Sequence, residues 1–242
     1  MTRTSPVFVI LVLFLLAVGC GGGIRMCTDK SAEKEYCGSE LTSPEKKALR
    51  RIFETILESG RAPTIEEMAV SLKKSDKDII RTLDELEGKD FLLRRKGTHE
   101  VISIYPISLT PTEHQIFLED RRRLFAMCAA DALGMPIMFD RNVKIVSQCE
   151  RCKQEITIEI KNGEIASVSH PNIMICSPKC QEARPAETTC PMVNFFCSKE
   201  HLEEWSAEHP DAARNTTQSL IDQAFPRIKE CWKSYGEILG IR

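Results

Sequence analysis

The amino-acid sequence predicts an α+β protein, in which a winged-helix-like module of three helices precedes a mixed α+β core with antiparallel strands. Two observations lead to this fold class. Between residues 44 and 106, three stretches with helical spacing of apolar residues precede two short strand-like stretches joined by a turn. From residue 107 to residue 242, strand-like segments follow one another between helices, an order typical of α+β proteins.

The first residues are expected to be a signal segment of the lipoprotein type. An unbroken apolar run from residue 6 to residue 19 follows Arg3, and its fourteen residues are too few to span a bilayer comfortably. The run ends in the letters AVGC, which resemble the lipobox of bacterial lipoproteins, and Cys20 would be the lipidated residue. The mature chain would then be a membrane-anchored, extracytoplasmic lipoprotein, attached to the membrane through its N-terminus.

The alternatives are an uncleaved anchor and a true start at Met26, and the second would make the protein cytoplasmic. In either case residues 1–23 are left out of the fold, and the polar residues 24–43 are expected to form a linker. The three glycines that follow Cys20 suit a flexible tether.

Each of the three predicted helices has a start signal. The signals are, in chain order, Ser43 before Pro44, the capping box of Thr64 with Glu67, and Ser75, while Gly60 and Gly88 end the first and third helices. The residues from Phe91 to Arg95 and from Val101 to Tyr105 then form a predicted hairpin around Lys96-Gly97. Three helices with a two-stranded wing are the winged-helix pattern, which places this module at residues 44–106.

A winged helix suggests DNA binding, but the charge of this one argues against it. Its third helix would lie in the groove, and between residues 76 and 87 it carries five acidic residues against Lys77 and Arg81, a net charge of −3. A helix of that charge is repelled by phosphates. Since the whole chain has a net charge of −2, no nucleic-acid partner is expected, and the module is interpreted as structural rather than as a transcription regulator.

After a link at residues 107–119, the core is expected to begin with an apolar helix. Leu124, Phe125, Ala129 and Leu133 have helical spacing, and Gly134 with Pro136 is expected to end this helix. Predicted strands follow at residues 143–147, 156–160, 165–169 and 192–197, and predicted helices begin at Ser198 and Gln218, the last one reaching Ile238. The core at 107–242 is therefore the part expected to carry the chemistry.

The predicted core helix places Cys128 and Asp131 one turn apart on the same face. A carboxylic acid in apolar surroundings keeps its proton to higher pH, and a thiolate is a ligand for soft metals. The pair is therefore suited to holding a soft metal while delivering a proton to the group that leaves it. The alternative is a buried structural cysteine beside an aspartate that pairs with the arginines at 121–123, and spacing alone favours this alternative.

Further cysteines predict a zinc site. The chain has 11 cysteines, among them the pairs Cys149 with Cys152 and Cys176 with Cys180, and 23 residues lie between the two pairs. Paired thiols at such spacing indicate a four-cysteine zinc site. Reduced structural thiols or a disulfide between strands are the alternatives, and the nearby His170 and Met174 are interpreted as packing or surface residues.

Several segments resemble one enzyme family. The segment DRRRLFAMCAADALGMP resembles the active-site helix of the organomercurial lyases (alkylmercury lyases), whose signature is an Asp-Arg-Arg-Leu-aromatic run followed by Cys-x-x-Asp. In the same order follow IVSQC, which ends in a structural cysteine at Cys149, CPMVNFFCS, in which Cys190 lies five residues before the pair Phe195-Phe196, and LEEWSAEHP, with Trp205. The resemblance covers roughly residues 44–235.

The resemblance implies protonolysis of carbon–mercury bonds, a lyase reaction of organomercurial detoxification and mercury resistance. Cys128 would attack the mercury of the organomercurial substrate, Cys190 would be the second thiolate, and Asp131 would protonate the carbon. Hg(II) would stay on Cys128 and Cys190 until small-molecule thiols or a mercuric-reductase-type acceptor removes it. No organic cofactor is implied, and structural zinc would be an addition.

Some positions depart from the family pattern. The second cysteine is often followed by another cysteine and a histidine, where Pro191 and Met192 stand here, and Asn194 stands where a histidine can occur. These departures could alter mercury release. A second hypothesis is a membrane-anchored, thiol-based carrier of copper or mercury without turnover, because the copper accessory lipoproteins of nitrous oxide reductase share part of this fold. Asp131 discriminates between the two, since a carrier has no use for a proton donor.

Overall fold

The computed structural model describes residues 41–178, 190–214 and 216–241. The predicted signal segment with Cys20, the start at Met26 and the cysteine at position 180 lie outside the described residues, so the predictions that concern them stay predictions. Among the described helices, none is both long enough and apolar enough to cross a membrane.

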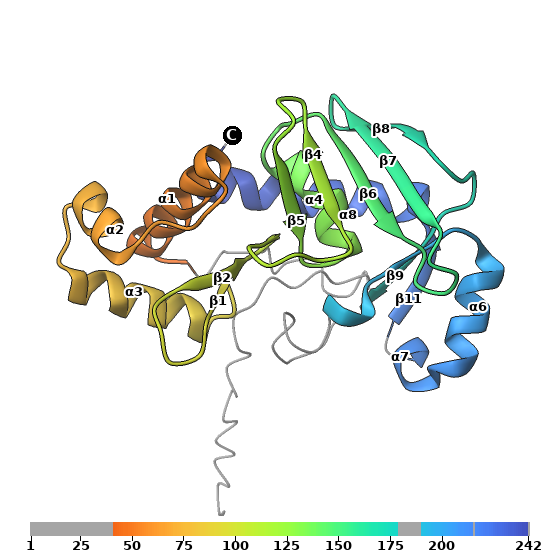
Figure 1. Cartoon of the computed structure of the whole chain (residues 1–242), viewed down its shortest axis with the longest axis horizontal. Coiled ribbons are helices and arrows are strands. Elements are labelled where there is room, and N and C mark those ends of the chain that lie inside the picture. The colour runs from red at the N-terminus through yellow and green to blue at the C-terminus, as the bar shows by residue number, and fades with distance from the viewer. Residues whose placement is uncertain (1–40, 179–189, 215, 242) are drawn as a thin grey trace, which may run out of the picture.

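Three helices open the fold, as the start signals predicted. They are α1 (Ser43–Ser59), α2 (Ile65–Leu72) and α3 (Asp76–Gly88), and they lie at the left of Figure 1. Thr42, not Ser43, is the N-cap of α1, because the side chain of Glu45 reaches back to the backbone amide of Thr42 at 2.6 Å. The hairpin β1 (Leu92–Arg94) and β2 (Val101–Ile104) follows α3. The assignment of this part to the winged-helix class stays a prediction.

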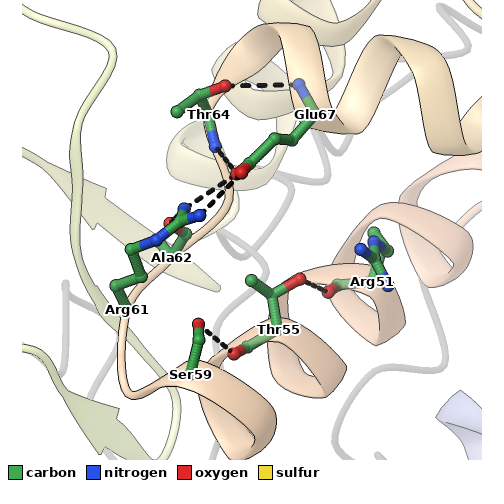
Figure 2. Close-up of polar contacts among 7 residues, drawn as sticks. All are labelled: Arg51, Thr55, Ser59, Arg61, Ala62, Thr64 and Glu67. Carbon is green, nitrogen blue, oxygen red and sulfur yellow. Dashed lines mark hydrogen bonds and ion pairs between the residues drawn. The ribbon is translucent and has the colours of Figure 1, made fainter.

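The start of α2 shows how local these signals are. The Thr64 hydroxyl accepts a hydrogen bond from the backbone amide of Glu67, and the Glu67 carboxylate accepts one from the backbone amide of Thr64 (Figure 2). Arg61 donates to both carboxylate oxygens of Glu67, at 2.8 and 2.6 Å. The capping box predicted from four residues of sequence is therefore present.

One antiparallel sheet of eight strands crosses from the helical module into the core. Its order is β1-β2-β3-β5-β4-β6-β7-β8, and the strands not yet given are β3 (Ile107–Ser108), β4 (Gln115–Leu118), β5 (Arg123–Ala126), β6 (Val143–Gln148), β7 (Glu155–Lys161) and β8 (Glu164–Val168). The expectation of a plain link at 107–119 was wrong, because Ile107 and Ile116 are fully buried in two short strands of this sheet.

The helices α4 (Ala129–Met138) and α8 (Ile221–Leu239) pack against each other behind the sheet (Figure 1). Gly134 makes their close approach possible, since a Cβ atom at this position would lie 2.0 Å from the indole ring of Trp232. The prediction that Gly134 and Pro136 end α4 was wrong, and the helix continues to Met138. Every residue of α4 is buried, so packing outweighs the cost of a proline inside the helix.

A second, three-stranded sheet completes the core, with the order β10-β9-β11. It consists of β9 (Met174–Pro178), β10 (Phe195–Phe196) and β11 (Thr216–Leu220), and it is accompanied by the short 3-10 helix η2 (Cys190–Met192), α6 (Lys199–Glu208) and α7 (Pro210–Arg214). The strand predicted at 192–197 is shorter than expected. The last helix begins at Ile221 rather than Gln218, because residues 216–220 pair with β9.

Candidate active site

The candidate site begins where β5 ends and α4 starts. Cys128 is not inside a helix, as the apolar spacing suggested, but is the N-cap of α4 in an extended conformation. The residues before it form β5, in which buried side chains alternate with an exposed and a half-buried one, and which pairs with β3 and β4. The helical interpretation of Leu124 and Phe125 was therefore wrong, because both residues lie in a short strand that ends just before the helix begins.

The N-cap position brings Cys128 and Asp131 together more closely than one shared helical face would. The residue at the N-cap and the residue three positions later face each other in a capped first turn. The Cys128 thiol lies 3.1 Å from Asp131 Oδ2, and the backbone amide of Asp131 lies 3.5 Å from the same sulfur. Both side chains are buried.

Asp131 does not pair with the neighbouring arginines. The Arg122 guanidinium is bound to Asp120, and Arg123 contacts Gln115 on the surface of the sheet. Burial raises the pKa of Asp131 to about 7, although hydrogen bonds from the two thiols lower it. The alternative, in which Asp131 pairs with the arginines at 121–123, is thus not what the structure contains. Asp131 is an acid that can hold or release a proton near neutral pH.

Cys190 reaches the same point from a distant part of the chain. It opens η2, and its sulfur lies 3.9 Å from Asp131 Oδ2. A backbone hydrogen bond of 3.0 Å from Ala129 to Val193 ties this segment to the start of α4. The two sulfurs and a carboxylate oxygen of Asp131 all lie within 4.8 Å of one another, and all three residues are buried.

The ionisation of the two buried groups beside Cys190 is strongly shifted. Burial, a hydrogen bond with Cys190 and the nearby Asp131 raise the pKa of the Cys128 thiol well above its ordinary value. Tyr105, which the sequence did not single out, lies with its hydroxyl 3.2 Å from the Cys190 sulfur, and burial together with Cys190 raises its pKa. The phenol therefore stays protonated and can donate a hydrogen bond to Cys190.

A second group of thiols lies apart from the first. It contains Cys149, Cys152, Cys197 and His201, whose ligand atoms also lie within 4.8 Å of one another. Burial raises the pKa of Cys149, but backbone hydrogen bonds of Cys152, Cys197 and Arg151 outweigh it and lower the pKa to about 7. A thiol with this pKa is readily available as a thiolate ligand.

Two of the four predicted zinc ligands lie in this second group. Cys149 and Cys152 are together, but Cys176 belongs to β9, and its thiol lies 3.0 Å from the hydroxyl of Thr216. The reason is the pairing of β9 with β11, which fixes Cys176 beside that strand. His170 is hydrogen-bonded to Ser169, and Met174 is buried, so neither belongs to the group.

Two residues of this second group were missed from the sequence. Cys197 and His201 are four positions apart at the start of α6, a spacing that places two ligands on one side of a helical turn. That spacing was the available signal. Tyr105 had none, because only the fold carries its hydroxyl to Cys190 across 85 positions of the chain.

Comparisons with known proteins find relatives of this chain in one enzyme family. The sequence model of the alkylmercury lyase (MerB) family matches residues 107–226, the part that contains both thiol groups. An alkylmercury lyase of Bacillus cereus is 28% identical over 156 residues, which cover 64% of this chain and 69% of that protein. An alkylmercury lyase of Pseudomonas putida is 26% identical over 190 residues, 75% of this chain and 85% of that protein.

A similar fold is known from a solved structure. The crystal structure of the mercury-bound form of MerB2 superimposes with a TM-score of 0.72 and 25% sequence identity, and covers 84% of this chain and 94% of its own. The match extends beyond residues 107–226, so it includes part of the helical module. From the family model, the relatives and this fold, the chain belongs to the alkylmercury lyase family.

Proposed function

We infer that this protein cleaves carbon–mercury bonds of organomercurials by protonolysis. The observation that carries the inference is the buried group of two thiols and one carboxyl, whose ligand atoms lie within 4.8 Å of one another. A soft metal needs the two sulfurs, and the carbon that leaves it needs a proton. The chain's membership of the alkylmercury lyase family supports the same reaction.

Cys128 and Cys190 are the proposed mercury ligands. Metal–sulfur bonds of roughly 2.3 Å, slightly longer for mercury, place two sulfurs on one metal roughly 5 Å apart at most. The separation of the two sulfurs, within 4.8 Å, meets this limit. Because both side chains are buried, the mercury would be bound away from water. Water would then not compete with the thiolates for the metal.

Asp131 Oδ2 is the proposed relay for the proton. It accepts a hydrogen bond from the Cys128 thiol at 3.1 Å and a longer one from the Cys190 thiol at 3.9 Å. When an organomercury cation binds, the first thiol releases its proton to solvent as its sulfur–mercury bond forms. The second thiol passes its proton to Asp131 as the second sulfur–mercury bond forms.

The last step consumes that proton. The carbon–mercury bond breaks, its electron pair takes the proton from Asp131, and the hydrocarbon leaves with the carboxylate restored. One organomercury cation and two thiols thus give one hydrocarbon, one mercury(II) dithiolate and one released proton. Small-molecule thiols or a mercuric-reductase-type acceptor would then exchange with Cys128 and Cys190 and take the mercury away.

The direct test is incubation of the purified chain with an organomercurial and excess small-molecule thiol. We expect catalytic release of one hydrocarbon per mercury delivered to the thiol, and no release from the Cys128→Ser variant, because a serine hydroxyl is a hard and poorly ionised ligand. Stoichiometric binding of the organomercurial without hydrocarbon would overturn the proposal and leave a thiol-based metal carrier as the function.

A further inference from the structure

We propose that Cys149, Cys152, Cys197 and His201 hold a resident zinc ion, at a site that is separate from the Cys128, Asp131 and Cys190 group. Among the described residues these are the two groups of side chains arranged to hold a metal, and they share no residue. The proposal goes beyond the lyase reaction, because this ion would take no part in it.

The spacing of the ligand atoms suits a tetrahedral metal. Two ligands at roughly 2.3 Å from a zinc ion, separated by the tetrahedral angle, lie roughly 3.8 Å from each other. The sulfurs of Cys152 and Cys197 are 3.6 Å apart. His201 Nδ1 lies 3.0 Å from the Cys197 sulfur and 3.8 Å from the Cys149 sulfur. Three sulfurs and one imidazole nitrogen form the Cys₃His set that structural zinc sites use.

Two rigid segments supply the ligands in pairs. Cys149 and Cys152 lie in the tight turn between β6 and β7, which is closed by hydrogen bonds from the Cys149 amide to the Gln154 carbonyl at 2.8 Å and from the Lys153 amide to the Cys149 carbonyl at 2.9 Å. Lys153 adopts a left-handed conformation, with φ 60°, which turns the chain back toward β7. The pair is therefore positioned before any metal binds.

The other pair comes from the junction of β10 and α6. Ser198 caps α6 and accepts a hydrogen bond from the backbone amide of His201, so the first turn of this helix is fixed. Cys197 precedes the cap and His201 follows four positions later, on the same side. A hydrogen bond of 2.9 Å from the Glu150 amide to the Phe195 carbonyl joins this junction to the β6–β7 turn.

A disulfide explains these four residues less well than an ion does. A disulfide between Cys152 and Cys197 would use two of the three sulfurs. It would not account for the positions of Cys149 and His201 beside them. Cys149 and Cys197 are buried, whereas Cys152 is exposed, so a small ion can reach the buried ligands from the surface at Cys152. Four nitrogen and sulfur ligands without an open position are the arrangement of structural rather than catalytic zinc.

The site would fix the path of the chain that leads away from Cys190. The segment from Cys190 to Cys197 is tied to α4 by the bond from Ala129 to Val193 and to the β6–β7 turn at Phe195. Zinc bound to Cys197 would fix the C-terminal end of this segment. We therefore expect the ion to stabilise the fold and, through it, the place of Cys190 beside Asp131.

The test is the zinc content of the purified chain after gel filtration with a metal chelator. We expect about one zinc per chain in the native protein and in the Cys128→Ser variant, and less than about one-tenth of that in the Cys152→Ala and His201→Ala variants. The His201→Cys variant, which restores a fourth ligand, should keep the ion. Cys176→Ser is the matched control, because this cysteine lies outside the group and should leave the zinc content unchanged.

A second readout does not depend on any variant. Cobalt(II) added to the zinc-free native chain should give the visible absorption bands of tetrahedral thiolate coordination, and zinc should remove them. Two results would overturn the proposal: a native chain that binds neither ion and shows a Cys152–Cys197 disulfide on mass spectrometry, or zinc that is lost from Cys128→Ser but kept by Cys152→Ala. The second result would place the ion at the active site. Failure of the lyase assay with normal zinc content would instead count against the proposed function alone.

Discussion

At the scale of single residues, the central feature is a buried carboxyl whose pKa lies near neutral pH. The pKa of Asp131 rises from its ordinary value of 3.8 to about 7, because the charged form is desolvated. Two thiols point at its Oδ2 atom, so the same oxygen can receive a proton from sulfur and pass it to carbon. Because this acid is buried in the core, the stability of the fold depends on pH.

That dependence gives a first prediction. Between pH 4 and pH 7 the folded chain keeps a proton on Asp131 that the unfolded chain has released, so stability falls as pH rises through this range. An Asp131→Asn variant lacks the dependence. Its free energy of unfolding relative to the native chain should rise by roughly 4 kcal/mol from pH 4 to above pH 7. Urea unfolding at each pH measures the difference, and a difference that does not change with pH would contradict the assignment.

Tyr105 provides a second prediction at this scale. Its protonated hydroxyl lies 3.2 Å from the Cys190 sulfur, where it can stabilise the thiolate that binds mercury. A single hydrogen bond is worth about 0.5–1.5 kcal/mol, so Tyr105→Phe should lower kcat/KM for organomercurials about 2- to 10-fold. Steady-state hydrocarbon release measures the effect. Native kcat/KM in a folded Tyr105→Phe variant would show that the contact has no part in the reaction.

At the scale of elements, the close contact of α4 with α8 positions the first turn that carries Cys128 and Asp131. Gly134 leaves room for the ring of Trp232, and a Cβ atom there would lie 2.0 Å from it. We predict that Gly134→Ala lowers the free energy of unfolding by more than about 2 kcal/mol, because a buried helix must shift. Gly88→Ala is the control, since its Cβ would meet nothing within 4 Å and alanine favours a helix.

Thermal unfolding of the two alanine variants compares them directly. The Gly134 variant should melt well below the native chain, and the Gly88 variant at or above it. Equal melting temperatures would show that α4 and α8 have room to separate, and that the glycine does not set their distance.

The elements also show what the sequence can and cannot predict. Capping signals at Thr64 and Ser75 act within four residues, and both were predicted correctly. The stretch before Cys128 was misjudged because four residues of alternating burial fit a helical face and a strand equally well. Nothing in such a short segment shows that it pairs with strands on both sides.

The site residues follow the same rule. Cys128 and Asp131 are three positions apart, so their contact could be expected from the sequence, although it arises from a helix cap rather than from a helical face. The group around Cys149 could not be completed, because Cys197 and Cys152 are 45 positions apart and only the meeting of α6 with the β6–β7 turn brings them together. Sequence spacing favoured Cys176, whose thiol instead lies against the Thr216 hydroxyl.

At the scale of the whole molecule, the helical module and the core share one structure. The sheet is continuous from β1 to β8, and α8 runs behind it toward α1 (Figure 1). Arg50 on α1 donates to the carbonyl of Leu239 at the end of α8, at 2.8 and 2.6 Å, and Phe91 stacks on Tyr235. The beginning and the end of the described chain are therefore packed together.

This arrangement predicts a single cooperative unfolding transition. Circular dichroism reports on the helices of both the module and the core, whereas tryptophan fluorescence reports on the core alone, through Trp205 and Trp232. The two signals should change at the same urea concentration. Separate transitions would show that residues 44–106 fold as an independent domain beside the core.

The most direct test of the central claim is a single turnover with the organomercurial bound to one equivalent of protein. For Asp131→Asn we expect unchanged binding of mercury, because both thiols remain, and hydrocarbon release slowed about 10²- to 10⁴-fold, because the carbon has lost its acid. Asp120→Asn, which changes an exposed aspartate paired with Arg122, should release hydrocarbon at the native rate. Release at the native rate from Asp131→Asn would contradict the account, since the proton would then come from another source.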